Sequence, residues 1–369
     1  MQIRLFHIEG FGMQYKRRVK ELHGMIEKKG FDGILVVNPE NIYYLTGAPF
    51  VIGGVGKLLY LGKDGSASLI VMDLDYEEAR EKAIGVDLVK TKLDERPLER
   101  LKKIAGKKLG VEETFLSQKF YEGLKKGFIP MPLGGAIEKM REVKDEEEVA
   151  SIEKSQRATE RALDEASKSF KEGMREREIV SEIEYHMRRE GAEAYAFENL
   201  VASGPRAIYP HGMPTAKKVG GGESVVLDLG VKVSGYCSDM TRTVFFGRPK
   251  REMVQVYEAV LESQKAALRA ARPGMTGKEL DGVAREVLDD KGYGKYFGHG
   301  LGHGVGIAIH EEPSVSLRGE EKLVPGNVIT IEPGVYIPKL GGVRIEDMIV
   351  MTEKGSRNLT RFRKDLLVF

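Results

Sequence analysis

Hydrophobic positions in the first third of the chain alternate between helical and strand spacing. Val19, Leu22 and Ile26 fall on one face of a helix, and Gly30 ends it. Residues 63–65 (Lys-Asp-Gly) separate two apolar runs and are typical of a β-hairpin turn. The pattern predicts helices over residues 15–29, 75–83, 98–104 and 117–126, and strands over residues 34–37, 57–62, 66–72, 86–90 and 108–111. Such alternation indicates α/β architecture.

Residues 128–135 (FIPMPLGG) break this periodicity with two prolines and two glycines. Because both residue types interrupt helices and strands, we predict a domain boundary here. The first domain then spans residues 1–127, the second spans residues 128–369, and residues 128–148 form the linker region. The charged run 139–148 is expected to be the solvated start of a helix.

The second domain contains an internal repeat. Residues 173–191 and 274–292 share a Gly-Met pair, a following Glu and a final Gly, each shifted by 101 positions. Residues 222–231 (GESVVLDLGV) similarly match residues 326–335 (GNVITIEPGV). Each copy predicts a helix, a Gly-Met break, a second helix and a pair of strands. A repeat of this length indicates a doubled supersecondary unit.

Alignment of the two copies places acid on acid. Asp228 matches Glu332, and a few residues later Asp239 matches Glu346. If the copies pack face to face, four carboxylates meet at their centre, where each uncompensated buried charge costs several kcal/mol or more. Two divalent cations would neutralise them. His303, in GHGLGHGVG, completes an oxygen-rich set with one imidazole, for which we expect Mn or Co first and Zn or Fe as alternatives.

Three further histidines and one arginine lie in the segments around these acids. His299 stands four residues before His303 among glycines, and His310 follows in the segment IHEEP. His211 occupies a turn-like segment, YPHG. Arg344 lies two residues before the last acid and shares its strand face. Its planar guanidinium would either orient that carboxylate or hold a substrate carboxylate.

Composition and charge exclude several classes of function. The 369-residue chain has 58 basic and 56 acidic residues, and a net charge of +2 predicts no nucleic-acid partner. Cys237 is the single cysteine, so we expect no disulfide, no thiolate metal site and a core position for this residue. Residues 53–57 (GGVGK) lack the Ser or Thr and the earlier glycine of a phosphate-binding loop. The apolar runs are too short for a signal peptide or a membrane span, so we predict a cytoplasmic protein without membrane contact.

At these residues the chain resembles the pita-bread metallopeptidases, which include proline dipeptidase, aminopeptidase P and methionine aminopeptidase. Residues 128–369 resemble their catalytic domain. Residues 1–127, with NPENIYYLTG at positions 38–47, resemble the creatinase-type N-terminal domain. The resemblance implies an α+β pita-bread fold with an internal pseudo-two-fold repeat, preceded by a smaller α/β domain. We further expect small peptide substrates and a homodimer.

The resemblance also implies how the five ligands divide between two metal ions. Asp239 and Glu346 would bridge the ions. Asp228 would bind one ion, while His303 and Glu332 would bind the other. Glu332 would in addition move protons between the attacking hydroxide and the leaving nitrogen.

Other residues would act on the substrate in the same comparison. His310 and His211 would contact the scissile peptide and its tetrahedral intermediate. His299 and Arg344 would shape the pocket for the residue after the scissile bond. Prolyl bonds need a dedicated enzyme because the imide nitrogen lacks an N–H and the ring restricts the backbone.

Four functions fit these sequence features to different degrees. The total length and short N-terminal domain favour hydrolysis of Xaa-Pro dipeptides with release of proline. The alternative is aminopeptidase P activity, which removes the first residue from longer Xaa-Pro peptides. A peptide-binding module without catalysis is disfavoured because all five ligands are present. A metal-free, creatinase-type C–N hydrolase is disfavoured because it would have to protonate most of the clustered acids.

Overall fold

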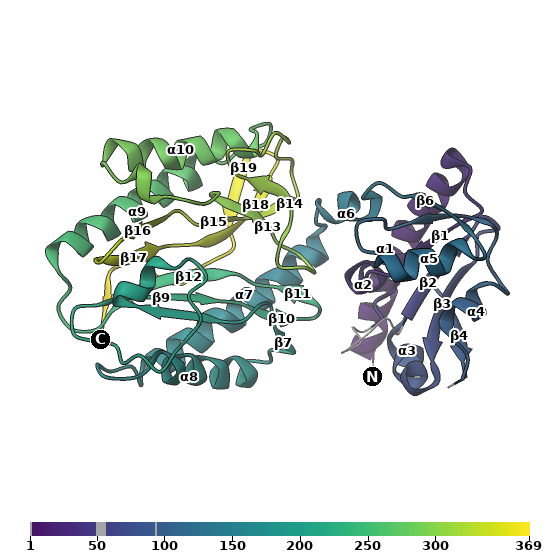
Figure 1. Cartoon of the computed structure of the whole chain (residues 1–369), viewed down its shortest axis with the longest axis horizontal. Helices are drawn as coiled ribbons and strands as arrows, with labels where there is room; N and C mark the ends of the chain where they lie inside the picture. The colour runs from purple at the N-terminus through teal and green to yellow at the C-terminus, as the bar shows by residue number, and fades with distance from the viewer. Residues whose placement is uncertain (1, 49–56, 93) are drawn as a thin grey trace. The chain divides into compact units, whose positions relative to one another are not determined.

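The chain folds into two compact units, residues 1–140 and residues 141–369 (Figure 1). The structure is a computed structural model that describes residues 2–48, 57–92 and 94–369. Residues 53–56 of the glycine-rich segment considered above lie outside the described residues. The division after residue 140 falls inside the linker region 128–148.

The N-terminal unit is built on a six-stranded sheet with the order β4-β3-β2-β1-β5-β6. Its strands are β1 (Gly33–Val36), β2 (Lys57–Gly62), β3 (Ala67–Met72), β4 (Asp87–Thr91), β5 (Lys108–Val111) and β6 (Ile129–Pro132). Its helices are α1 (Gln2–Lys29), α2 (Pro39–Thr46), η1 (Asp73–Asp75), α3 (Tyr76–Lys82), α4 (Pro97–Leu101), α5 (Gln118–Lys125) and α6 (Ala136–Arg141). Each helix and strand predicted before residue 127 is present, although α1 begins well before residue 15.

Periodicity alone does not predict α2, η1, β6 or α6 of this unit, and the charged run 139–148 covers the end of α6 and the start of the next helix rather than one helix start. α2 begins where the Asn38 side chain accepts hydrogen bonds from the backbone of Glu40 and Asn41, and it ends at Gly47 with φ +68°. β6 contains Pro130 and Pro132, which suit an edge strand because an edge position does not require every N–H. The proline-rich break therefore supplies a strand to the N-terminal sheet.

The second unit, called the catalytic unit below, shows the predicted repeat. Its helices are α7 (Glu146–Ser167), α8 (Glu176–Arg189), η2 (Gly204–Ile208), α9 (Arg251–Ala270), α10 (Gly277–Asp290) and η3 (Gly294–Tyr296). The helix pairs α7/α8 and α9/α10 lie on opposite sides of the sheets (Figure 1). Gly173 and Gly274 precede the second helix of each pair with φ +85° and +88°, a conformation that glycine adopts without strain.

The strands of this unit form two larger and two smaller sheets. The larger sheets have the orders β20-β12-β9-β8 and β14-β13-β15-β18-β19, and the smaller ones β11-β10-β7 and β16-β17. The strands are β7 (Ala194–Tyr195), β8 (Leu200–Ser203), β9 (Ser224–Leu229), β10 (Val231–Val233), β11 (Tyr236–Cys237), β12 (Met240–Phe245), β13 (Gly302–Gly304), β14 (Glu311–Val315), β15 (Val328–Ile331), β16 (Gly334–Ile337), β17 (Gly341–Arg344), β18 (Asp347–Thr352), β19 (Gly355–Asn358) and β20 (Leu367–Val368). In each repeat a long antiparallel pair, β9/β12 or β15/β18, encloses a short hairpin.

Each repeat buries its own apolar core, and polar contacts join the two. Ile183 and Leu227 belong to the first core, and Leu280 and Ile331 to the second. Between the repeats, the backbone N–H of Glu346 donates to Thr241 O at 3.1 Å. The fully buried Arg242 donates to Asp347 Oδ1 at 2.9 Å. These contacts fix β12 of one repeat against β18 of the other.

None of the helices in the described part of the chain combines the length and the apolar character that a membrane span requires.

Two glycines of α10 should respond in opposite ways to the same substitution. A Cβ on Gly277 would lie 2.0 Å from the carbonyl oxygen of Ser314, whereas a Cβ on Gly282 meets no described heavy atom within 4 Å. We expect Gly277→Ala to lower the free energy of unfolding by about 1–3 kcal/mol through overpacking. Gly282→Ala should raise it by about 0.5–1 kcal/mol because alanine favours the helix. Thermal unfolding of both variants checks the signs, and equal shifts would contradict the close approach.

Candidate active site

The four acids lie at corresponding strand ends of the two repeats. Asp228 is the penultimate residue of β9, and Asp239 directly precedes β12, which pairs with β9. Glu332 directly follows β15, and Glu346 directly precedes β18, which pairs with β15. Because the long strands are buried and paired on both sides, their ends are rigid supports for these side chains.

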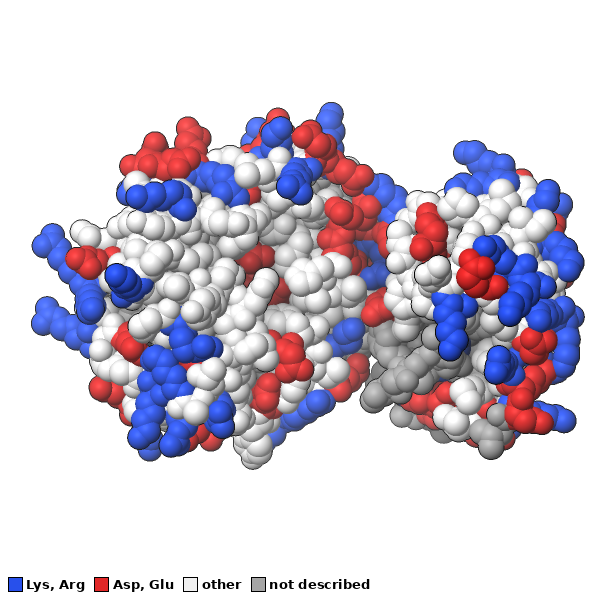
Figure 2. All heavy atoms as spheres, viewed as in Figure 1, with Lys and Arg blue, Asp and Glu red and all other residues white. Residues whose placement is uncertain are grey.

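A cavity of about 610 Å³ lies where these strand ends meet. Figure 2 shows acidic side chains recessed among uncharged residues in the visible face of this unit. The cavity wall includes every predicted site residue: Asp228, Asp239, His303, Glu332, Glu346, His211, His299, His310 and Arg344. The repeat and the histidine segments therefore meet in one place, although they are spread over more than 130 positions of sequence.

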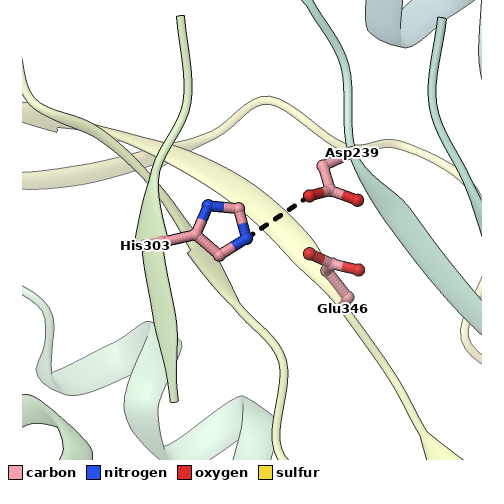
Figure 3. Close-up of side chains that lie close together, drawn as sticks. All are labelled: Asp239, His303 and Glu346. Carbon is pink, nitrogen blue, oxygen red and sulfur yellow. Dashed lines mark ion pairs between the residues drawn. The ribbon is translucent and has the colours of Figure 1, made fainter. Parts of the chain in front are cut away.

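Asp239, His303 and Glu346 form the tightest part of this group (Figure 3). One potential ligand atom from each lies within 4.8 Å of the others. His303 Nε2 is 3.5 Å from Asp239 Oδ2 and 3.4 Å from Glu332 Oε1. On its other side, His303 Nδ1 lies 3.1 Å from Gly304 O and can donate to it, which would leave Nε2 as the nitrogen that binds a metal ion.

The shared burial of the acids perturbs their protonation. Burial raises the pKa of Asp239 well above its usual range, and the charges of Glu346 and Asp228 raise it further. Burial likewise raises the pKa of Glu346, and the charges of Glu332 and Asp228 add to the effect. Without cations the cluster would therefore hold its protons to a higher pH than ordinary carboxyl groups do.

Glu332 behaves differently from its neighbours. Burial by itself would raise the pKa of Glu332, but the hydrogen bond and charge of His303 outweigh it and lower the pKa to about 2. Thr330 Oγ1 also donates to Glu332 Oε1 at 3.0 Å. The carboxylate of Glu332 is thus ionised where it lies beside a protonated His303.

The oxygens of Asp228 and Glu346 fit a site for cations. Arg344 Nη2 donates to Asp228 Oδ2 at 2.6 Å, and Thr241 Oγ1 donates to Glu346 Oε2 at 2.7 Å. The second oxygen of each carboxylate, Oδ1 of Asp228 and Oε1 of Glu346, is buried without a hydrogen-bond partner among the described residues. Buried acceptors need a partner, and a divalent ion with oxygen and imidazole ligands supplies one.

Arg344 is held by several groups around the cavity. Its guanidinium binds Asp228, donates from Nε to Thr241 Oγ1 at 3.0 Å and donates from Nη1 to Tyr336 OH at 2.9 Å. Nη1 also lies 3.1 Å from Pro210 O. Of the two roles considered for this residue, these contacts favour the orientation of a carboxylate, and that carboxylate is Asp228 rather than Glu346.

Sequence reasoning missed Thr241 and Tyr336, whose hydroxyl groups form hydrogen bonds with residues of the site. Thr241 lies two residues after Asp239 on a strand, and that spacing alone places both on one face. Tyr336 OH joins Arg344 to His299 Nε2, which lies 3.0 Å away. Periodicity gives no signal for Tyr336, because only the hairpin β16/β17 brings it to Arg344.

Cys237 occupies the core position expected of it, and His310 lies on the cavity wall beside His303. Cys237 is fully buried, and its Sγ contacts Ile307 O at 3.3 Å, which confirms a core position. The ring of His310 is centred 4.4 Å from that of His303 at the cavity wall.

Comparison with known proteins agrees with this geometry. Residues 150–353 match Metallopeptidase family M24, and residues 18–143 match the Creatinase/Prolidase N-terminal domain. The chain belongs to metallopeptidase family M24. The predicted family, pita-bread fold and metallopeptidase class are thereby confirmed, and the family binds divalent metal ions.

Three relatives illustrate how far the similarity extends. A protein of Pyrococcus furiosus named Xaa-Pro dipeptidase is 42% identical over 358 residues, 95% of this chain and 100% of the relative. The crystal structure of the prolidase from Pyrococcus horikoshii is 40% identical, with a TM-score of 0.89, over 95% of this chain and 100% of that one. The X-Pro aminopeptidase of Thermotoga maritima is 34% identical, with a TM-score of 0.86, over 95% and 99%.

Loss of the Thr241 hydroxyl should weaken metal binding although Thr241 is not a candidate ligand. Thr241→Val removes the donor to Glu346 and the acceptor for Arg344, so both supports of the carboxylates loosen. We expect the affinity for divalent ions to fall by about 10–100-fold, the usual effect of losing such a supporting contact. Calorimetric titration with Mn²⁺ measures it.

Thr91→Val is the matched control, because Thr91 is equally buried in a strand but lies in the N-terminal unit. It should leave metal affinity unchanged. Equal affinity in wild type and Thr241→Val would show that Thr241 plays no part in holding Glu346.

Proposed function

We propose that the protein is an Xaa-Pro dipeptidase that uses two divalent metal ions to release proline. The observation that carries this proposal is the convergence of four carboxylates and His303 in one cavity with two buried carboxylate oxygens unpartnered among the described residues. The full-length similarity to a protein named Xaa-Pro dipeptidase supports the substrate class. The cavity of about 610 Å³ suits a small peptide.

Asp228, Asp239, His303, Glu332 and Glu346 would hold the ions in this proposal. Asp239 and Glu346 would hold both ions, as the family resemblance implies, and their potential ligand atoms lie within 4.8 Å of each other. Asp228 would bind one ion, and His303 with Glu332 the other. Mn or Co is the proposed metal, with Zn or Fe as alternatives. When bound, such a pair supplies an activated water and polarises the scissile carbonyl.

The protein's own side chains would bind the peptide and move protons. Glu332, hydrogen-bonded to Thr330, would accept a proton from the attacking water and deliver it to the leaving imide nitrogen. His211 and His310, on the cavity wall, would contact the peptide carbonyl. His299, fixed by Tyr336, would bound the space for proline.

A second candidate function is aminopeptidase P activity, and the charges on the cavity wall favour testing it. Among the described residues of that wall, Arg344 is the single Lys or Arg, and it is already bound to Asp228. Ser314 and Ser316 contribute neutral hydroxyls. The carboxylate of a dipeptide therefore meets no unengaged Lys or Arg among the described residues of this wall, whereas a longer peptide needs none.

A homodimer and a cytoplasmic location stay predictions of the sequence.

The substrate length distinguishes these two activities. We expect Mn²⁺-loaded protein to cleave Met-Pro and to leave intact a longer peptide that begins Met-Pro. Chromatography of released methionine and proline measures the cleavage of each peptide, and a chelator should abolish the cleavage of Met-Pro because the site depends on metal. Cleavage of the longer peptide alone would replace the dipeptidase assignment with aminopeptidase P.

His303 and Glu332 should differ in how their variants respond to added metal. His303→Ala removes only a ligand, so excess Mn²⁺ should partly restore activity. Glu332→Gln keeps one ligating oxygen but removes the base, so kcat should fall by ~10²–10⁴-fold at every metal concentration. Activity measured against Mn²⁺ concentration gives the comparison.

Glu353→Gln, at an exposed position, serves as the control for a charge lost at the surface. Equal rescue of His303→Ala and Glu332→Gln by metal would mean that Glu332 is a ligand and carries no proton.

A further inference from the structure

A buried glutamate outside the ligand set holds the loop that carries His211. The loop, residues 204–215, leaves β8, passes through η2 and places Pro210 and His211 on the cavity wall. Glu176, the first residue of α8, has no exposed surface and lies against both ends of this loop. None of the roles assigned so far involves this carboxylate.

Both oxygens of Glu176 accept hydrogen bonds from residues at the two ends of the loop, Ser203 at the end of β8 and Thr215. Oε1 accepts from Ser203 N at 2.8 Å and from Ser203 Oγ at 2.9 Å. Oε2 accepts from Thr215 N at 3.0 Å and from Thr215 Oγ1 at 2.6 Å. Arg206, inside the loop, donates from Nε to Oε2 at 3.2 Å and from Nη2 to Met213 O at 2.7 Å. One carboxylate therefore joins residues that are twelve positions apart.

The rest of the loop is packed too closely to adjust if this anchor is lost. A Cβ on Gly212 would lie 2.5 Å from the Cβ of Ala202, and a Cβ on Gly342 would lie 2.0 Å from Ala207 O. The loop is thus pressed between β8 and β17, and Pro210 O accepts from Arg344. Because the loop cannot take up a change locally, we expect a shift at Glu176 to move the loop as a whole, His211 included.

The interaction requires a charged carboxylate. Burial would raise the pKa of Glu176, but the hydrogen bonds from Thr215 and Ser203 outweigh it and lower the pKa below its usual value. Every group around Glu176 named above is a donor. An amide in its place would turn its NH₂ toward other donors and leave a buried polar group unsatisfied.

The second repeat contains a similar arrangement around another histidine. Asp281 of α10, also without exposed surface, accepts from Leu301 N at 2.9 Å and from Arg285 Nε at 2.5 Å. Arg285 in turn donates to the carbonyl oxygens of Phe297 and His299. In both repeats the second helix therefore supplies a buried acid that fixes a segment carrying a histidine of the cavity.

We propose that Glu176 is a positioning residue that acts on peptide hydrolysis through His211. The inference rests on the proposed function, because it requires His211 to contact the reacting peptide. Displacement of a contacting group by about 1 Å is sufficient to slow a reaction by ~10²-fold. Loss of Glu176 should therefore lower kcat while the metal ligands stay in place.

A double-mutant cycle of Glu176→Gln and His211→Ala tests this role. With Mn²⁺-loaded protein and whichever Xaa-Pro peptide wild type cleaves, Glu176→Gln alone should lower kcat by ~10–100-fold. In the His211→Ala background the same change should lower kcat by less than about 3-fold, because residues that act through one another are not additive. Metal stoichiometry should stay at the wild-type value in each variant.

Two further variants separate positioning from a general loss of stability. Glu178→Gln changes an exposed residue of the same helical turn that does not contact the loop, and it should leave kcat unchanged. Thr215→Val removes one hydroxyl and retains the Glu176 carboxylate, so it should fold and show a smaller loss of kcat that also disappears in His211→Ala.

Equal factors for Glu176→Gln with and without His211 would overturn the proposal, as would an unchanged kcat. If Glu176→Gln fails to fold, the same comparison made with Thr215→Val decides. A wild-type protein that cleaves neither Met-Pro nor the longer peptide would instead contradict the proposed function.

Discussion

Four carboxylates line one cavity, and their mutual repulsion is the constraint on which the rest of the catalytic unit depends. The structure answers it in two ways. Donors of the protein, Arg344 for Asp228 and Thr241 for Glu346, hold one oxygen of each carboxylate. The other oxygens stay buried without a partner among the described residues and are suited to cations. The same repulsion requires rigid supports for the acids. On a mobile segment, a carboxylate would move toward solvent and the ligands would no longer lie close together.

The doubled architecture gives this site its geometry. Each repeat folds around its own apolar core and brings one pair of acids to the ends of an antiparallel strand pair. Contacts across the repeats then set the distance between the pairs: the Glu346 N–H donates to Thr241 O, and Arg242 binds Asp347. Residues that do not bind metal themselves hold the side chains and segments of the cavity wall. Tyr336 joins Arg344 to His299, and Glu176 and Asp281 hold the histidine segments from the second helices.

Much of the fold could be predicted from local pattern because its elements are strongly periodic. Most helices and strands of the N-terminal unit appear where hydrophobic spacing places them. Gly173 and Gly274, the glycines of the two Gly-Met breaks, both have a positive φ. β6 was missed because prolines argue against a strand unless it lies at an edge, and edge position is a property of the whole sheet. Likewise, Tyr336 lies on a short hairpin whose sequence carries no sign of its partners.

By itself, the sequence determined which side chains bear the chemistry. Two matching copies with acids at equal positions, and histidines concentrated around them, required a shared polar centre, since unpaired acids at the ends of apolar strands are too costly to bury alone. Only the tertiary structure decided how those side chains are held. Arg344 pairs with Asp228, 116 positions away, and not with Glu346, two positions away. The physical reason is that repeat spacing reports which residues share a strand face, whereas the partner of each polar atom depends on how separate elements pack, and that packing is a property of the folded chain.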